Sequence, residues 1–391
     1  MKILIRTLSQ GIGLHLIDAW NAYVQHLNNY SNDIEYILKD ISDNTKFDDC
    51  DLSILFDYMG NRITTDMIKA HDIVLICNGG EPVLVGSPLM KELLTHENVF
   101  LIANAYLTQD HELKNKVIWF PHNIQTCRDY WTQHFYPQYF DLQSWKTNKK
   151  INSLFYINGA NRPHRQLFID YLQKLNLDIK VQNSFTSHIS KLYDSQWESD
   201  EDTKFRDWVN EQYNTIQHEQ YVDSYYVNSH TIGIHNKFGK IPPGYFHLPL
   251  YFENFCVIFP ETSWQNNELC ITEKSLKCFY AETLPMPVGG AKLNQLYNDV
   301  GFSTAWNLLP HEFQQFDSIL DHQLRYFKLS QAVEWLYTNP QVFVSEQYTK
   351  MIEKNKINFL TSGCNYRSVI NFDRILAQFI KPNSKVNQID T

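Results

Sequence analysis

The sequence predicts an α/β protein made of two lobes, each folded around a parallel sheet. Two apolar runs, residues 72–77 (DIVLIC) and 255–259 (FCVIF), lack the alternation expected of half-exposed strands, and segments with helical periodicity stand between the strand-like runs. The chain has 391 residues, which is enough for two to three domains. Strands that are apolar on both faces and separated by helices indicate sheets covered on both sides. Both lobes are therefore predicted to be Rossmann-like.

The first lobe is predicted to span residues 1–125, where strand and helix patterns alternate. Residues 126–150 are aromatic and polar, with a proline in the middle, and they are interpreted as the linker to the next lobe. The strands are expected at residues 2–7, 34–38, 72–77, 99–103 and 117–120. Helices are expected at 14–27 and 89–94, and a further helix is expected to end with residues 67–70.

The second lobe is predicted to span residues 151–340 and to carry an acidic, aromatic insertion at about 193–236. Pro163 falls in the first turn of a predicted helix, where a proline is favourable. Residues 341–391 are expected to form a mostly helical tail, interrupted near 361–363. The strands are expected at residues 153–157, 255–259 and 286–288, and the helices at 163–175 and 272–282.

The composition excludes several classes of protein. The 34 Lys and Arg are outnumbered by 43 Asp and Glu, so the chain lacks the cationic surplus of a protein that grips duplex DNA or an anionic bilayer along its length. The seven cysteines include no C-x-x-C pair, which favours reduced thiols and a cytoplasmic location. No stretch approaches the ~20 apolar residues of a membrane span, so a soluble protein is expected.

The segment Thr272-Glu273-Lys274 has the pattern of an anion site at a helix start. Thr272 is a good N-cap, and the free N–H groups of a first helical turn favour a negatively charged ligand. A lysine in the first turn opposes the helix dipole, and a bound phosphate would compensate its charge. A carboxylate such as that of Glu273 can accept hydrogen bonds from ribose hydroxyls. The pattern also fits an ordinary capped surface helix.

The second lobe contains a series of short motifs in a definite order. They are Asn161-Arg162-Pro163-His164-Arg165, the FEN of residues 252–254, Glu261-Thr262, Thr272-Glu273-Lys274, Gly289-Gly290 and Gly301-Phe302. Their order resembles that of the alpha-1,3-fucosyltransferases of glycosyltransferase family ten, and residues 153–325 are most similar to the phage and marine-bacterial relatives of that family. The resemblance implies a GT-B-type architecture and an inverting, metal-independent transfer of a hexose.

The same resemblance implies which residues bind the donor, a nucleoside-diphosphate sugar with GDP as the usual carrier. Arg162 or Arg165 and Lys274 would neutralise the diphosphate, since fixed cations must stabilise the leaving group where no metal does so. Glu273 would hold the ribose, and no cofactor besides the donor is implied. Ile271 stands where fucosyltransferases have a tyrosine that lines the donor site, so the hexose stays open, with fucose one candidate. The implied donor-binding set is Asn161, Arg162, Arg165, Glu261, Thr272, Glu273 and Lys274.

An inverting displacement also needs a base that takes the proton of the acceptor hydroxyl. The base is expected in the first lobe, at the carboxyl end of a strand. Glu81, which follows the strand at 72–77 and the turn Asn78-Gly79-Gly80, is the best candidate for the base, although a cap of the next helix is the more ordinary interpretation of this residue. Asp110, Glu112 and His122 are weaker candidates.

Two other functions remain open at this stage. A phage-type enzyme that decorates modified DNA bases needs only a local basic groove, so the acidic net charge does not exclude a nucleic-acid acceptor. A nucleotide- or carbohydrate-binding module that has the fold without catalysis would keep the donor motifs. The primary prediction is transfer of a hexose to a hydroxyl of a glycan, and no site with the spacing of metal ligands is predicted.

Overall fold

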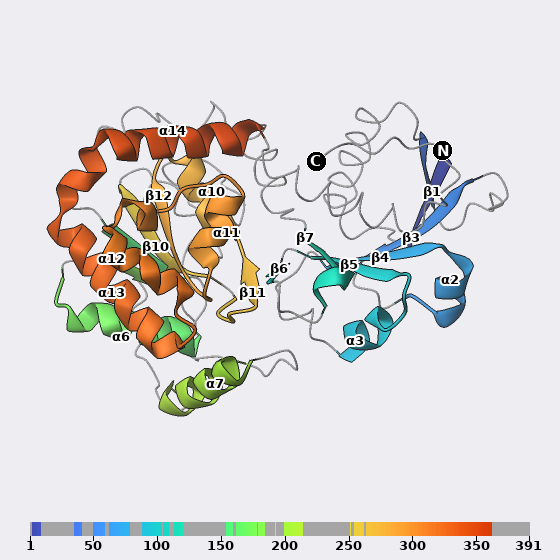
Figure 1. Ribbon diagram of the computed structural model, residues 1–391, viewed down its shortest axis with the longest axis horizontal. Helices are drawn as coiled ribbons and strands as arrows, with labels where there is room; N and C mark the ends of the chain where they lie inside the picture. The colour runs from blue at the N-terminus through green and yellow to red at the C-terminus, as the bar shows by residue number, and fades with distance from the viewer. Residues whose placement is uncertain are drawn as a thin grey trace, which may run out of the picture. The chain divides into compact units, whose positions relative to one another are not determined.

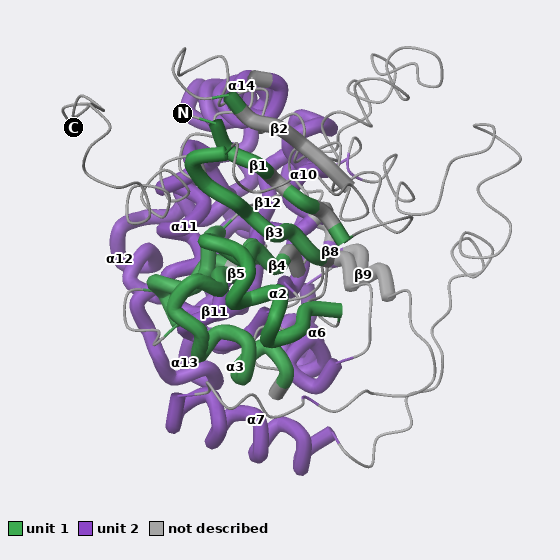
Figure 2. The backbone as a smooth tube through the Cα atoms, turned by 90° about the vertical axis from the view of Figure 1, so that its right-hand side faces the viewer, with its two compact units in different colours: residues 1–122, 364–391 green, residues 123–363 purple. Residues whose placement is uncertain are grey.

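A computed structural model describes two compact units of the chain, coloured separately in Figure 2. The first unit comprises residues 1–122 and 364–391, and the second comprises residues 123–363. The residues whose structure is described are 2–8, 35–40, 50–58, 62–78, 88–103, 105–108, 113–119, 154–158, 162–177, 179–183, 192, 199–213, 251, 254–261 and 263–361. The predicted helix at 14–27 and the predicted linker at 126–150 lie outside this set.

The first unit is built on a parallel sheet with the strand order β2-β1-β3-β4-β5-β7. Its core joins buried side chains of β3, β4 and β5 to those of α2 and α3, among them Leu55, Ile68, Val74, Leu93 and Leu101. The elements of this unit are β1 (Lys2–Thr7), β2 (Glu35–Asp40), β3 (Leu52–Tyr58), α2 (Thr65–Ala70), β4 (Ile73–Asn78), α3 (Pro88–Leu94), β5 (Val99–Ala103), β6 (Ala105–Leu107) and β7 (Val117–Trp119).

The central strand β3 was not predicted from the sequence. Ser53 and Asp57 interrupt its apolar run, and both are buried. The hydroxyl of Ser53 donates to Asp72 over 2.7 Å, and Asp57 accepts from Arg62 over 2.8 Å. A polar side chain with such a partner can sit in a buried strand, but the partner cannot be read from the strand itself.

The second unit contains a parallel sheet with the order β12-β10-β8-β9. Figure 1 shows α6 and α13 on one side of this sheet and α10 and α11 on the other. Its elements are β8 (Leu154–Asn158), α6 (Pro163–Lys174), β9 (Lys180–Asn183), α7 (Asp200–Tyr213), β10 (Cys256–Pro260), β11 (Glu268–Cys270), α10 (Glu273–Tyr280), β12 (Leu284–Val288), α11 (Leu293–Asp299), α12 (His311–Gln314), α13 (His322–Thr338) and α14 (Glu346–Thr361).

The predicted fold class, α/β with a parallel sheet in each of two Rossmann-like lobes, is confirmed. The 17-residue helix α13 was missed, and its buried face explains why. That face includes His322, Arg325 and Ser330 beside its apolar residues, so the apolar periodicity on which a sequence prediction relies is broken.

The chain order identifies the edge of each sheet where a ligand is expected. In an open parallel sheet, ligands bind beyond the carboxyl ends of two strands whose connections leave in opposite directions. In the second sheet these strands are β8 and β10, because β9 lies on one side of β8 and β12 lies beyond β10 on the other. The segments that follow them lead into α6 and α10, which start at Pro163 and Glu273.

None of the helices in the described ranges is long and apolar enough to cross a bilayer. Four of the cysteines, Cys50, Cys256, Cys270 and Cys278, belong to those ranges, and all four are free thiols.

Candidate functional site

The site is built around Glu261, the residue that follows β10. Its carboxylate is fully buried and accepts hydrogen bonds from the backbone N–H of Thr272 (3.3 Å) and from the Thr272 hydroxyl (2.6 Å). Thr272 is the N-cap residue of α10, as predicted, but its hydroxyl donates to Glu261 and accepts no hydrogen bond from an N–H of its own helix. The buried negative charge therefore lies at the amino end of α10, where the helix dipole stabilises it.

Glu261 also contacts the first turn of α6 through its backbone carbonyl. The guanidinium of Arg165 donates to this oxygen over 3.3 Å, and Nε2 of His164 lies 3.4 Å from it. The side chain of Arg165 is only 2% exposed. The starts of α6 and α10 thus meet at one residue, although 96 positions separate Arg165 from Glu261 in the sequence.

The positively charged side chains of the site are largely inside the protein. Lys274, in the first turn of α10, is 8% exposed, so neither it nor Arg165 lies on the outer surface. Burial, followed by the charges of Arg165 and Arg162, lowers the pKa of His164 well below its usual value, so this imidazole is neutral. Fixed cations at low exposure are suited to neutralising a polyanion, since solvent screens them little.

The structure groups some of the predicted donor residues and leaves others undescribed. Arg165, Glu261 and Thr272 are joined by hydrogen bonds, Arg162 is the N-cap residue of α6, and Lys274 follows Thr272 by two positions. Glu273 begins α10, but its side chain is outside the described set, as is Asn161. All four candidate bases, Glu81, Asp110, Glu112 and His122, also lie outside it.

Two residues near Glu261 were missed by the sequence analysis. Tyr297 of α11 donates its hydroxyl to the carboxylate over 2.9 Å, and Ser275 of α10 donates over 3.3 Å. Burial, followed by the negative charge of Glu261, raises the pKa of Tyr297 well above its usual value. No spacing in the sequence links Tyr297 to Glu261, because their contact depends on how α11 packs beside β11 and β12.

The turn Gly289-Gly290, at the end of β12, holds the neighbouring loop in place. A Cβ atom on Gly290 would lie 1.9 Å from the backbone oxygen of Gln265. Only glycine allows the loop of residues 263–268 to approach this closely. The loop connects β10 to β11 and so leads from Glu261 towards Thr272.

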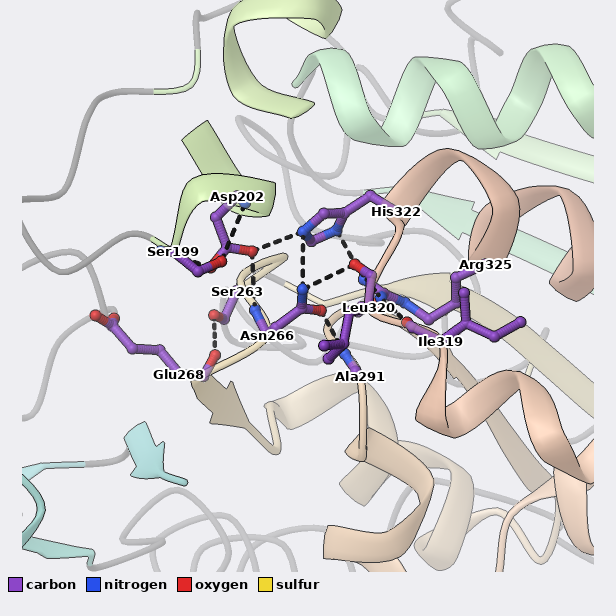
Figure 3. A network of polar contacts seen from close by, with 11 residues as sticks. Ser199, Asp202, Ser263, Asn266, Glu268, Ala291, Ile319, Leu320, His322 and Arg325 are labelled. Atoms are coloured by element: carbon purple, nitrogen blue, oxygen red, sulfur yellow. Dashed lines mark hydrogen bonds and ion pairs between the residues drawn. The ribbon is translucent and has the colours of Figure 1, made fainter. Parts of the chain in front are cut away.

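A second polar network fixes the same loop to α7 and α13 (Figure 3). Nε2 of His322 lies 2.6 Å from Asp202, and the guanidinium of Arg325 donates to Nδ1 over 2.7 Å. The proton of the imidazole is therefore on Nε2, with an arginine on one side and a carboxylate on the other. The backbone N–H of Asn266 also donates to Asp202, over 3.2 Å. This network ties helix α7 to the loop beside the site.

The network predicts a dependence of stability on pH. Burial lowers the pKa of His322 to about 4, against 6.5 for an ordinary histidine. A histidine with a lowered pKa stabilises the folded chain fully above pH 6.5 and loses that contribution as the pH falls towards 4. Between pH 7 and pH 4.5, we expect the free energy of unfolding of wild type to fall by about 2–3 kcal/mol more than that of His322→Gln. Urea unfolding at both pH values measures this difference, and equal losses would contradict it.

The described residues contain no group of three or more His, Cys, Asp or Glu side chains that could hold a metal ion. The site described above instead joins the starts of α6 and α10 at Glu261, with the buried basic residues Arg165 and Lys274 in their first turns, at the sheet edge where a ligand is expected. Its chemistry suits an anionic ligand.

Comparison with known proteins gives similarities to solved structures only. No family model and no curated protein matches the chain. A crystal structure of an alpha1,3-fucosyltransferase has 11% identity, covers 96% of this chain and 90% of its own, and has a TM-score of 0.47. The apo structure of OtsA has 7% identity, coverage of 96% and 98%, and a TM-score of 0.42. A Staphylococcus aureus MnaA–UDP structure has 10% identity, 97% coverage of each chain and a TM-score of 0.37. All three TM-scores are below 0.5, and the identities are 7–11%.

Proposed function

We propose that the chain is an inverting, metal-independent glycosyltransferase of GT-B type, which moves a hexose from a nucleoside-diphosphate sugar to a hydroxyl of a glycan. The observation that carries the proposal is the meeting of Arg165 and the first turn of α10 at Glu261. This cationic site lies at the sheet edge where an open parallel sheet binds its ligand. The motif resemblance in the second lobe supports GDP as the carrier.

The site residues have distinct roles in the proposed reaction. When the acceptor oxygen attacks the anomeric carbon, the bond to the diphosphate breaks and negative charge collects on the departing phosphate oxygens. Lys274 and Arg165, with Arg162 beside them, stabilise that charge without a metal ion. Asn161 and Glu273 complete the donor contacts, with Glu273 on the ribose. Glu81 takes the proton of the acceptor hydroxyl.

The proposal is tested by titrating the full chain with GDP, UDP and ADP in the presence of EDTA. We expect one of the three, GDP first, to bind with micromolar affinity, because buried cations hold the diphosphate without a metal ion. Isothermal titration calorimetry gives the three affinities. Absence of binding by every nucleoside diphosphate would contradict the proposal.

Catalysis is tested separately with the corresponding sugar nucleotide and a panel of glycans. We expect consumption of the donor, a product of inverted anomeric configuration by NMR, and loss of transfer in Glu81→Gln with donor binding retained. A binding module would bind the nucleotide without turnover. Transfer to modified DNA in place of glycans would identify a nucleic-acid acceptor.

A further inference from the structure

The hydroxyl groups of Tyr297 and Ser275 lie buried against the carboxylate of Glu261. Both donate to Oε1 of Glu261, and the two hydroxyls also contact each other. The side chains of Tyr297, Ser275 and Glu261 are all fully buried. They lie on three separate elements, namely α11, α10 and the end of β10.

Glu261 makes hydrogen bonds to residues at the starts of two helices, α10 and α6. Its carboxylate binds the backbone and hydroxyl of Thr272, which sets the start of α10, and its carbonyl accepts from Arg165 of α6. A carboxylate that accepts several hydrogen bonds in a buried site is held in one orientation. The position of Lys274, two residues after Thr272, is therefore linked through Glu261 to the position of Arg165.

We infer that Tyr297 and Ser275, through Glu261, are positioning residues for the diphosphate: they fix the first turn of α10 so that Lys274 and Arg165 act on the same phosphate groups. This inference rests on the proposed function. It gives Glu261 a position behind the donor, where it orients both cations and makes no contact with the sugar nucleotide. When cations are held in place before the ligand binds, little of the binding free energy is lost in ordering their side chains.

The variant Tyr297→Phe tests the inference, because it removes one hydroxyl and leaves the ring. We expect the dissociation constant of the nucleoside diphosphate to rise about tenfold, the usual effect of losing one hydrogen bond to a charged group. Affinity for the matching nucleoside, which has no phosphate, should stay unchanged. Calorimetry with both ligands gives this comparison.

Tyr326→Phe is the matched control. Tyr326 is another fully buried tyrosine of the same unit, and among the described residues its hydroxyl has no hydrogen-bond partner. This variant should bind both ligands as wild type does. Ser275→Ala is the second test variant in case Tyr297→Phe does not fold. It too should lower the affinity for the nucleoside diphosphate and leave the affinity for the nucleoside unchanged.

Two results would overturn the inference while the proposed function stands. One is wild-type diphosphate affinity in both Tyr297→Phe and Ser275→Ala. The other is an equal loss of affinity for diphosphate and nucleoside, which marks a general structural defect. Failure of wild type to bind any nucleoside diphosphate would instead contradict the proposed function itself.

Discussion

Replacing Lys274 by alanine is expected to lower kcat/KM for sugar transfer about 10²–10³-fold. Lys274, in the first turn of α10, is 8% exposed, so little solvent screens its charge. Removal of one preorganised group that stabilises charge in a transition state has an effect of this size. Initial rates at several donor concentrations give kcat and KM separately. Because the lysine acts on the leaving group, we expect kcat to fall as well as donor affinity.

The control for Lys274→Ala is Lys328→Ala, which removes an exposed lysine of α13 in the same unit. Its activity should equal that of wild type. Lys274→Arg keeps the charge with a different shape and should recover part of the lost rate. Full kcat/KM in Lys274→Ala would contradict a role for Lys274 in the reaction.

Replacing Arg325 by alanine is expected to lower the free energy of unfolding by about 4 kcal/mol, since each buried acceptor that loses its donor costs about 1–3 kcal/mol. Arg325 is 1% exposed, and its guanidinium donates to the carbonyls of Gly289 and Leu320 as well as to His322. Without it, the carbonyl of Gly289 and Nδ1 of His322 each lose the hydrogen bond that Arg325 donates, whereas the carbonyl of Leu320 keeps the one from Asn266. Burial also lowers the pKa of this arginine, to about 10, which leaves it charged at neutral pH.

The stability of Arg325→Ala is measured by urea unfolding of the full chain at pH 7. Arg325→Lys should lower the free energy of unfolding by less than the alanine variant does, since the ammonium group of lysine can replace some of the hydrogen bonds of the guanidinium. Lys328→Ala, one turn further along α13, should lie within 0.5 kcal/mol of wild type, as expected for an exposed surface position. Equal stability of Arg325→Ala and Lys328→Ala would show that the network contributes nothing to the fold.

Local patterns were sufficient to predict much of the fold. The strand β10 is continuous and apolar, and the helix α6 begins with a proline, so both were predicted with small errors in their bounds. The strand β3 and the helix α13 were missed because buried polar residues interrupt their apolar patterns. Their partners, such as Asp72 for Ser53 and Asp202 for His322, are distant in the sequence. Periodicity carries no information about such pairs.

The candidate site was predictable to a similar extent. The motif that contains Arg165 and the motif that contains Lys274 each stood out as a short pattern, and the resemblance to a family placed them in one site. The contact of Arg165 with the carbonyl of Glu261 required the structure, as did the role of Tyr297. A backbone oxygen has no side chain that marks it in a sequence. The place of Tyr297 depends on the packing of α11 beside β11 and β12.

The near contact between Gly290 and the backbone of Gln265 bears on how the protein can be engineered. The backbones at Gly290 and Gln265 are so close that neither a side chain at position 290 nor extra backbone fits between them. A residue inserted in the 263–268 loop would therefore have to bulge away from the turn. Such a bulge would shift Asn266, which holds both Asp202 and the N–H of Ala291. Libraries that seek a new donor preference should therefore vary side chains around α6 and α10 and keep the length of this loop constant.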